Sequence, residues 1–258
     1  MRLKVNYLCW FMTRYAHDTI LPDQQSNLSK KLQVERMFDN ISPRYDFLNR
    51  FLSLGIDKGW RRKALAELKS IQPRNILDVA TGTGDVAIMA AKRLNPESIT
   101  GIDISEKMLE HGREKVKAAG LEHKITLLKG DSETISAPAA SFDAVTVAFG
   151  VRNFQHLEAG LAEIFRVLRP GGKLVVLEFS KPTAFWIKPF YQFYLHYVCP
   201  IIGRLISKDK TAYTYLNHSI NKFPEGENFT RILGNTGFKN TFQKKLSFGI
   251  CSIYCGEK

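Results

Sequence analysis

A glycine-containing turn at residues 80–85 has the residue types and spacing needed to hold a nucleotide-like ligand. The apolar run 75–79 precedes the turn and a second apolar run, 86–91, follows it, which is typical of a buried strand, a tight turn and a helix. Gly82 and Gly84 allow backbone conformations closed to other residues, and the following helix presents free N–H groups and a positive dipole end. We therefore expect this turn to cradle a nucleotide-like group.

Asp103 supplies a carboxylate that can complete such a site. The pattern Gly82-x-Gly84-x-x-Ala87 fits the dinucleotide-binding fingerprint, and Asp103 follows at about the distance where that motif places its ribose-binding acid. The pattern does not by itself distinguish a nicotinamide dinucleotide from S-adenosylmethionine, so both ligands stay open at this point.

The elements around the turn alternate between strands and helices. The expected elements are strands 99–104, 124–129, 142–149 and 173–179, a helix opened by Ser105 as N-cap, a helix at 157–168, a helix near 226–234, and an antiparallel pair at 238–246 and 249–255. This order predicts an α/β fold with a parallel, doubly wound sheet, which binds ligands beyond the carboxyl ends of its strands. Further polar candidates fall at such ends: Asp131, Ser132, Arg152 and Asn153.

Segments outside this alternation are also informative. Residues 24–258 are expected to form one domain, with a helical preface at 24–72 and an aromatic, lysine-flanked insertion at 180–210 that suits either a membrane interface or a lid over an apolar ligand. Residues 1–23 are expected to be a disordered extension, and Met12 is an alternative start.

Composition narrows the classes of partner. The chain has 258 residues, and its 37 Lys+Arg against 25 Asp+Glu give a net charge of +12. This charge favours an anionic partner, such as nucleic acid or an acidic membrane surface, or simply serves solubility. The four cysteines and six histidines show no metal-ligand spacing, so we expect no metal site, and no apolar run is long enough to span a membrane.

Two further features separate the candidate cofactors. A dehydrogenase leaves Asp131-Ser132 and the turn Pro170-Gly171-Gly172 without a role, whereas class I S-adenosylmethionine methyltransferases have a polar residue after the third strand and such a turn before the fifth. The chain therefore resembles that class, which implies a Rossmann-like, seven-stranded, mostly parallel sheet with an antiparallel last strand, N-terminal helices and a helical insertion. Ala80 departs from the usual loop by replacing its first glycine with the smallest side chain.

From about Val34 to the C-terminus, the chain resembles the menaquinone and ubiquinone ring C-methyltransferases. Residues 45–49 (Tyr-Asp-Phe-Leu-Asn) with Trp60 are similar to the first signature of that family, and residues 166–180 are similar to the second. Residues 149–153 resemble the family's segment after the fourth strand. Asp57 departs from the pattern, because many members carry a histidine there, and this weakens any catalytic role for that position.

The resemblance implies methyl transfer from S-adenosylmethionine to a ring carbon of a prenylated quinol such as demethylmenaquinol, in menaquinone biosynthesis. It implies a cofactor site made by Gly82, Thr83, Gly84, Asp103, Asp131 and Ser132. A ring carbon becomes nucleophilic when a ring hydroxyl loses its proton, so Arg152 is expected to stabilise the phenolate directly or through a water, with Tyr45 and Asn153 orienting the ring.

Several alternatives stay open. A benzoquinol of ubiquinone biosynthesis is an alternative acceptor, and the oligomeric state, a homo-oligomer included, is undecided. A cytoplasmic enzyme on the inner face of an anionic membrane suits the charge of the chain. An RNA methyltransferase is the enzymatic rival, although the chain lacks the Asn/Asp-Pro-Pro-Tyr/Phe and Pro-Cys elements of nucleic-acid enzymes, and no nucleic-acid partner is expected. A further alternative is a non-catalytic protein that binds lipid and acts as a scaffold.

Overall fold

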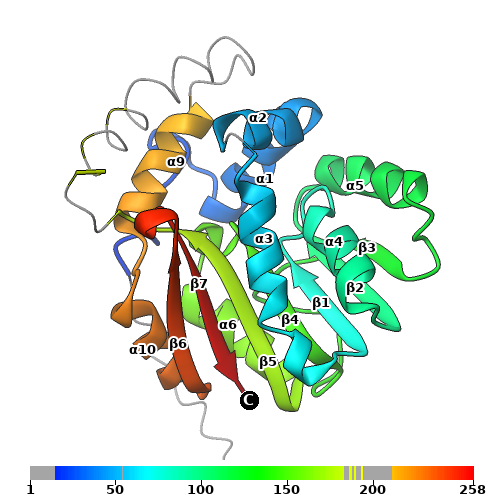
Figure 1. The fold of residues 1–258 in the computed structure, drawn as a ribbon. Coiled ribbons are helices and arrows are strands. Elements are labelled where there is room, and N and C mark those ends of the chain that lie inside the picture. The colour runs from blue at the N-terminus through cyan, green and yellow to red at the C-terminus, as the bar shows by residue number, and fades with distance from the viewer. Residues whose placement is uncertain (1–14, 54, 183–185, 188, 190–192, 194–210) are drawn as a thin grey trace, which may run out of the picture.

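A seven-stranded sheet forms the centre of the computed structural model, which describes residues 15–53, 55–182, 186, 187, 189, 193 and 211–258 (Figure 1). The strand order is β3-β2-β1-β4-β5-β7-β6. The strands are β1 Asn75–Val79, β2 Ser98–Asp103, β3 Ile125–Lys129, β4 Phe142–Ala148, β5 Leu168–Phe179, β6 Lys239–Leu246 and β7 Cys251–Glu257. β1 to β5 pair in parallel, while β7 is antiparallel to both β5 and β6. The predicted fold class is confirmed.

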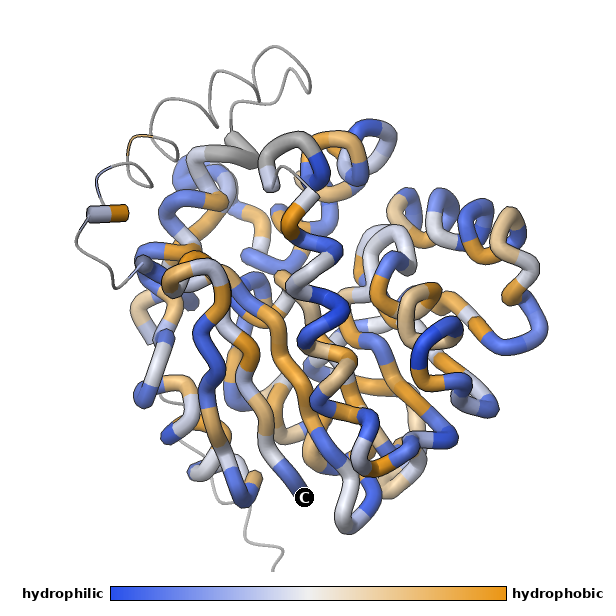
Figure 2. Tube along the Cα trace, viewed as in Figure 1, coloured by the Kyte–Doolittle hydropathy of each residue, from blue (hydrophilic) through white to orange (hydrophobic). Residues whose placement is uncertain are grey.

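Helices cover both faces of this sheet. They are α1 Lys30–Ile41, α2 Tyr45–Leu52, α3 Asp57–Ala66, α4 Asp85–Leu94, α5 Glu106–Ala118, α6 Leu157–Val167, α9 Thr211–Lys222 and α10 Glu227–Thr236. In β1, Ile76 packs in a core with α3, α4 and α5, whereas its neighbour Leu77 packs in a second core with α6 and α10. Because side chains alternate along a strand, β1 is buried on both faces, and Figure 2 shows the apolar residues concentrated along such central strands.

A third, smaller core lies at the end of the sheet where the parallel strands finish. There α1, α2 and α9 pack together through Val34, Met37, Ile41, Leu48 and Tyr215 (Figure 1). The predicted helical preface is thus three helices, α1 to α3. Pro43 ends the first of them, because the chain continues as a 3-10 turn, Ser42–Arg44, with the proline in its first positions.

β5 begins earlier than the sequence predicts. We expected Pro170-Gly171-Gly172 to precede a strand at 173–179, but β5 includes this segment and starts at Leu168, which pairs with Phe142. Gly171 has a positive φ of 79°, and its N–H donates to the carbonyl of Lys258 at 2.7 Å. The turn is therefore hydrogen-bonded to the C-terminal residue and stays within the sheet.

Residues 15–23, which fall in the predicted N-terminal extension, contact the rest of the domain. His17 is fully buried, its carbonyl accepts a hydrogen bond from Lys30 Nζ at 2.9 Å, and the Tyr15 hydroxyl donates to Glu158 at 2.6 Å. Residues 1–14, and most of the predicted insertion at 180–210, lie outside the described residues. Among the described residues, no helix has the length and apolar character to cross a bilayer.

Candidate active site

The glycine turn after β1 adopts the backbone conformation that the sequence predicts. Gly82 and Gly84 have φ angles of 55° and 74°, in the left-handed region that favours glycine. A side chain at Gly82 would meet no atom within 4 Å, so the backbone there faces open space. The helix α4 starts at Asp85, directly after the turn. This is the arrangement in which main-chain N–H groups can approach a ligand closely.

Ala80, which replaces the first glycine of the usual loop, also has a positive φ, of 54°. A side chain at Gly150 would lie only 2.5 Å from the Ala80 methyl, so these two loops touch. The replacement is therefore not neutral: an L-residue in this conformation costs about 1–2 kcal/mol, and the methyl group requires glycine at position 150.

Asp103 lies at the end of β2 and is held by the loops around it. Its Oδ2 accepts the N–H of Gly82 at 2.8 Å, and its Oδ1 accepts the N–H of Ser105 at 2.9 Å. Burial raises the pKa of Asp103 to about 6, against these hydrogen bonds, which favour the ionised form. The carboxylate is thus oriented directly beside the glycine turn.

Asp131 and Ser132 follow β3 at the next strand end. Asp131 accepts the N–H of Glu133 at 2.9 Å and forms an ion pair with Lys31 of α1. On the same helix, Asp39 accepts a hydrogen bond from the Ser105 hydroxyl at 2.6 Å. Polar contacts therefore hold α1 across the ends of β2 and β3, above the predicted cofactor residues.

A cavity joins most of the predicted site residues. Gly82, Asp103, Asp131 and Ser132 line it together with Tyr45 and Asn153. Its apolar walls come from α1, the end of β2, the start of α5 and the loop after β4; they include Val34, Phe38, Ile102, Ile104, Met108 and Phe149. Acidic and amide groups with apolar walls suit the hydroxyls and flat ring of a nucleoside. Gly84 lines neither this cavity nor the one described next, and its φ of 74° places it within the turn.

A second, smaller cavity lies on the other side of the glycine turn, and Tyr45 and Gly82 line both cavities. Asp78 at its base is buried and accepts hydrogen bonds of 2.6 Å from the hydroxyls of Thr81 and Thr146. Burial raises the pKa of Asp78 to about 6. Tyr45 therefore stands where the two cavities meet.

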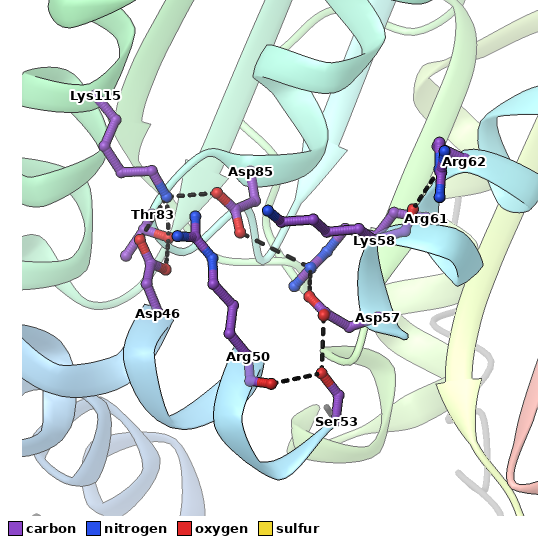
Figure 3. A network of polar contacts seen from close by, with 10 residues as sticks. All are labelled: Asp46, Arg50, Ser53, Asp57, Lys58, Arg61, Arg62, Thr83, Asp85 and Lys115. Carbon is purple, nitrogen blue, oxygen red and sulfur yellow. Dashed lines mark hydrogen bonds and ion pairs between the residues drawn. The ribbon is translucent and has the colours of Figure 1, made fainter. Parts of the chain in front are cut away.

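Thr83 lines the second cavity, but its hydroxyl is engaged by a helix. It donates to Asp46 of α2 at 2.6 Å, and Lys115 of α5 lies 2.6 Å from Asp46 and 2.5 Å from Asp85 (Figure 3). The same hydroxyl lies 3.0 Å from Lys115 Nζ. This network attaches α2 to the glycine turn and so closes the second cavity.

Arg61 completes the second cavity, and sequence reasoning did not select it. Its guanidinium forms an ion pair with Asp57, lies 3.8 Å from Asp85, and has a buried Nε without a hydrogen-bond partner (Figure 3). The Asp57 carboxylate, at the position where we expected many family members to carry a histidine, thus holds Arg61. The only sequence signal for Arg61 is that it directly follows Trp60 of the first signature.

Arg152 is buried in the 3-10 turn Val151–Asn153 after β4. Its Nη1 donates to Glu178 at 2.7 Å and to the carbonyl of Phe149 at 2.5 Å, and its guanidinium lies 5.6 Å from the centre of the Phe179 ring. Unlike Asn153, Arg152 does not line the first cavity, and Glu178 offsets part of its charge. The side chain is therefore held in place by a fully buried carboxylate.

The fold and site place the chain among the methyltransferases with a Rossmann-like sheet. It superposes with a TM-score of 0.60 on a chain of the complex between the Haloferax volcanii Trm112 methyltransferase activator and the putative methyltransferase, which is 14% identical, over 85% of this chain and 96% of that one. A SAM-dependent methyltransferase from Thermotoga maritima gives 0.56 at 20% identity, over 86% and 99%. At these low sequence identities, the structural similarity supports the fold alone.

The chain belongs to the ubiE/COQ5 methyltransferase family, whose model matches residues 25–258. A demethylmenaquinone methyltransferase from Bacteroides fragilis is 49% identical over 95% of this chain and 99% of its own length. A ubiquinone/menaquinone biosynthesis C-methyltransferase from Geotalea daltonii is 47% identical over 88% of this chain and 96% of its own. The family that the two signatures predicted is confirmed.

Proposed function

We propose that this protein transfers a methyl group from S-adenosylmethionine to a ring carbon of a prenylated quinol, with demethylmenaquinol as the acceptor. The observation that carries the proposal is the pair of cavities that meet at Tyr45: one is lined by acids suited to a nucleoside, and the other by charged groups. The similarity to the demethylmenaquinone methyltransferase over nearly its full length supports the choice of acceptor.

The residues present fit S-adenosylmethionine. Asp103 is suited to the ribose hydroxyls, and Asp131 with Ser132 to the adenine edge, since all three line the first cavity. In the second cavity, the unpaired Nε of Arg61 is suited to an α-carboxylate, and Asp78 or Asp85 to an α-ammonium group. Bound there, the cofactor would supply a methyl group activated by its positively charged sulfur.

The protein's own groups would prepare the acceptor ring. When a ring hydroxyl gives its proton to water, negative charge develops on that oxygen and the neighbouring carbon becomes nucleophilic; after methylation, the same carbon loses its hydrogen as a proton. Arg152 can stabilise the charged oxygen, directly or through a water, because a guanidinium stays cationic. Burial raises the pKa of Tyr45, so this side chain stays a neutral donor that can orient the ring beside Asn153. No step in this scheme needs a metal ion.

An exposed aromatic pair supports a membrane-associated acceptor. Trp186 and Phe248 are 53% and 63% exposed, and their rings meet edge to face at 5.2 Å. Phe248 lies in the turn Ser247–Gly249 between β6 and β7, at the end of the sheet where β5 finishes. With the net charge of +12, this position favours peripheral contact with an anionic bilayer on the cytoplasmic side, from which a prenylated ring can enter.

The experiment that tests the proposal uses S-adenosylmethionine labelled in its methyl group. The purified protein is incubated with reduced demethylmenaquinol, with a demethylated benzoquinol of the ubiquinone pathway, and with RNA. Label is expected in the naphthoquinol. Label only in the benzoquinol would move the acceptor to the ubiquinone series, whereas label only in RNA, or in none of the three, would contradict the proposal.

A further inference from the structure

Tyr215 of α9 carries a hydroxyl group that the structure leaves unsatisfied. The side chain is 3% exposed and packs against the apolar residues Val34, Met37, Ile41 and Leu48 of α1 and α2. Its hydroxyl is buried and has no hydrogen-bond partner. A phenylalanine would fill the same space without burying an unpaired polar group, so a partner outside the chain is the simplest reason for a tyrosine here.

Two more unpaired polar atoms lie in the turn that α9 contacts. Arg152 Nε and Asn153 Oδ1 are both buried without a hydrogen-bond partner, and α9 contacts the 3-10 turn that carries them. Tyr45, where the two cavities meet, packs against the same apolar cluster as Tyr215. Buried, unpaired donors and an acceptor therefore lie on two elements that contact each other, beside an apolar cluster, which matches an aromatic ring that bears oxygen atoms.

We propose that Tyr215 is a substrate-binding residue, whose hydroxyl donates a hydrogen bond to a ring oxygen of the quinol beside Arg152. The inference rests on the proposed function and adds a residue to the acceptor site. Because burial raises the pKa of Tyr215, the hydroxyl stays protonated at neutral pH and can donate. Glu178 neutralises part of the charge of Arg152. A second donor beside Arg152 compensates for this, because the Tyr215 hydroxyl and the Arg152 guanidinium can stabilise the same developing negative charge.

The test compares Tyr215→Phe with the wild-type protein and with Tyr254→Phe as a matched control. Tyr254 is also a buried tyrosine, but its hydroxyl accepts the N–H of Gly226 at 2.9 Å, and the residue lines neither cavity. We expect Tyr215→Phe to lower kcat/KM for reduced demethylmenaquinol by about 10- to 100-fold, the effect of losing a hydrogen bond to a charged group. Tyr254→Phe should leave kcat/KM within about twofold.

Two measurements separate a binding role from a structural one. Calorimetry is expected to give unchanged affinity of Tyr215→Phe for S-adenosylhomocysteine, and its melting temperature should equal or exceed that of the wild type, because no satisfied contact is lost. Affinity for a short-chain demethylmenaquinol, measured with S-adenosylhomocysteine present and under reducing conditions, should fall. Unchanged quinol kinetics, or a loss confined to stability and cofactor affinity, would overturn the inference. If the wild-type protein methylates no quinol, the proposed function itself fails.

Discussion

Asp103 is a partly buried, charged residue of this site, and its burial makes both stability and cofactor binding depend on pH. Its carboxylate is oriented by two backbone N–H groups, yet burial raises its pKa from 3.8 to about 6. Between about pH 4 and pH 6, the folded chain therefore holds a proton at Asp103 that the unfolded chain has already released. By linkage, the stability contributed by this group is greatest below pH 4 and is lost as the pH rises through 6.

For Asp103 we predict that a rise in pH lowers the stability of the free protein but raises its affinity for the cofactor. Without cofactor, Asp103→Asn should stabilise the protein relative to wild type more at pH 7 than at pH 4.5, measured by urea unfolding. Affinity of the wild type for S-adenosylmethionine should instead rise as the pH increases through about 6, since the ionised carboxylate accepts hydrogen bonds better. Calorimetry from pH 5 to 8 tests this, and equally strong binding by Asp103→Ala would contradict the assigned role.

Ala80 and Gly150 form a second test at this scale. Ala80→Gly is expected to raise the free energy of unfolding by about 0.5–1 kcal/mol, because the φ of 54° no longer strains a side chain. Gly150→Ala should lower it by about 1–3 kcal/mol, because its methyl group would lie 2.5 Å from that of Ala80. In the double variant most of that loss should disappear. Simple additivity in urea unfolding would show that the two methyl groups do not clash.

At the scale of elements, the shape of the site depends on the helices α1 and α2, which lie across the carboxyl ends of the parallel strands. The glycine turn and the strand ends supply acids, but α1 reaches them through Lys31 and Asp39, and α2 through Asp46. These helices come before the sheet in sequence and close its cavities from above. The attachment of α2 depends on Lys115, whose ammonium group lies between Asp46 and Asp85 (Figure 3).

Removing that cation should loosen α2. Lys115→Met leaves two carboxylates facing each other, so we expect unfolding to need about 1 kcal/mol less and proteolysis within residues 45–52 to become faster. Lys117→Met, on the same helix but exposed, is the matched control and should change the unfolding free energy by less than about 0.5 kcal/mol. Equal effects of the two variants would mean that the network at Lys115 does not hold α2.

At the scale of the whole molecule, charge and exposed aromatic groups bear on where the protein works. The protein should sediment with vesicles that contain phosphatidylglycerol and should be released as salt is raised, because a Debye length near 10 Å at about 0.1 M screens surface charges. Phe248→Ser should weaken this binding several-fold. Leu128→Ser is the control, since Leu128 is 48% exposed on β3 at the opposite edge of the sheet. Vesicle binding that changes neither with salt concentration nor with either substitution would contradict membrane contact.

Much of this architecture was predictable from the sequence because its signals are local. Apolar runs and the turns between them indicate the strands, Ser105 caps α5 as its position predicts, and the glycine turn takes the φ angles that only its residue types favour. The two signatures were enough to identify the family. The start of β5 was predicted wrongly because Leu168 pairs with Phe142, and Gly171 and Gly172 form hydrogen bonds with Lys258, which are contacts between residues far apart in the chain.

The sequence alone determined the class of fold, the family and the set of acids at the strand ends, because these depend on short-range patterns. Only the tertiary structure showed that Tyr45 lines both cavities, that Arg152 is paired with Glu178, and that Arg61 and Tyr215 carry buried atoms without a hydrogen-bond partner. These facts depend on how helices pack over the sheet, and no spacing within one segment encodes which distant side chains will lie together.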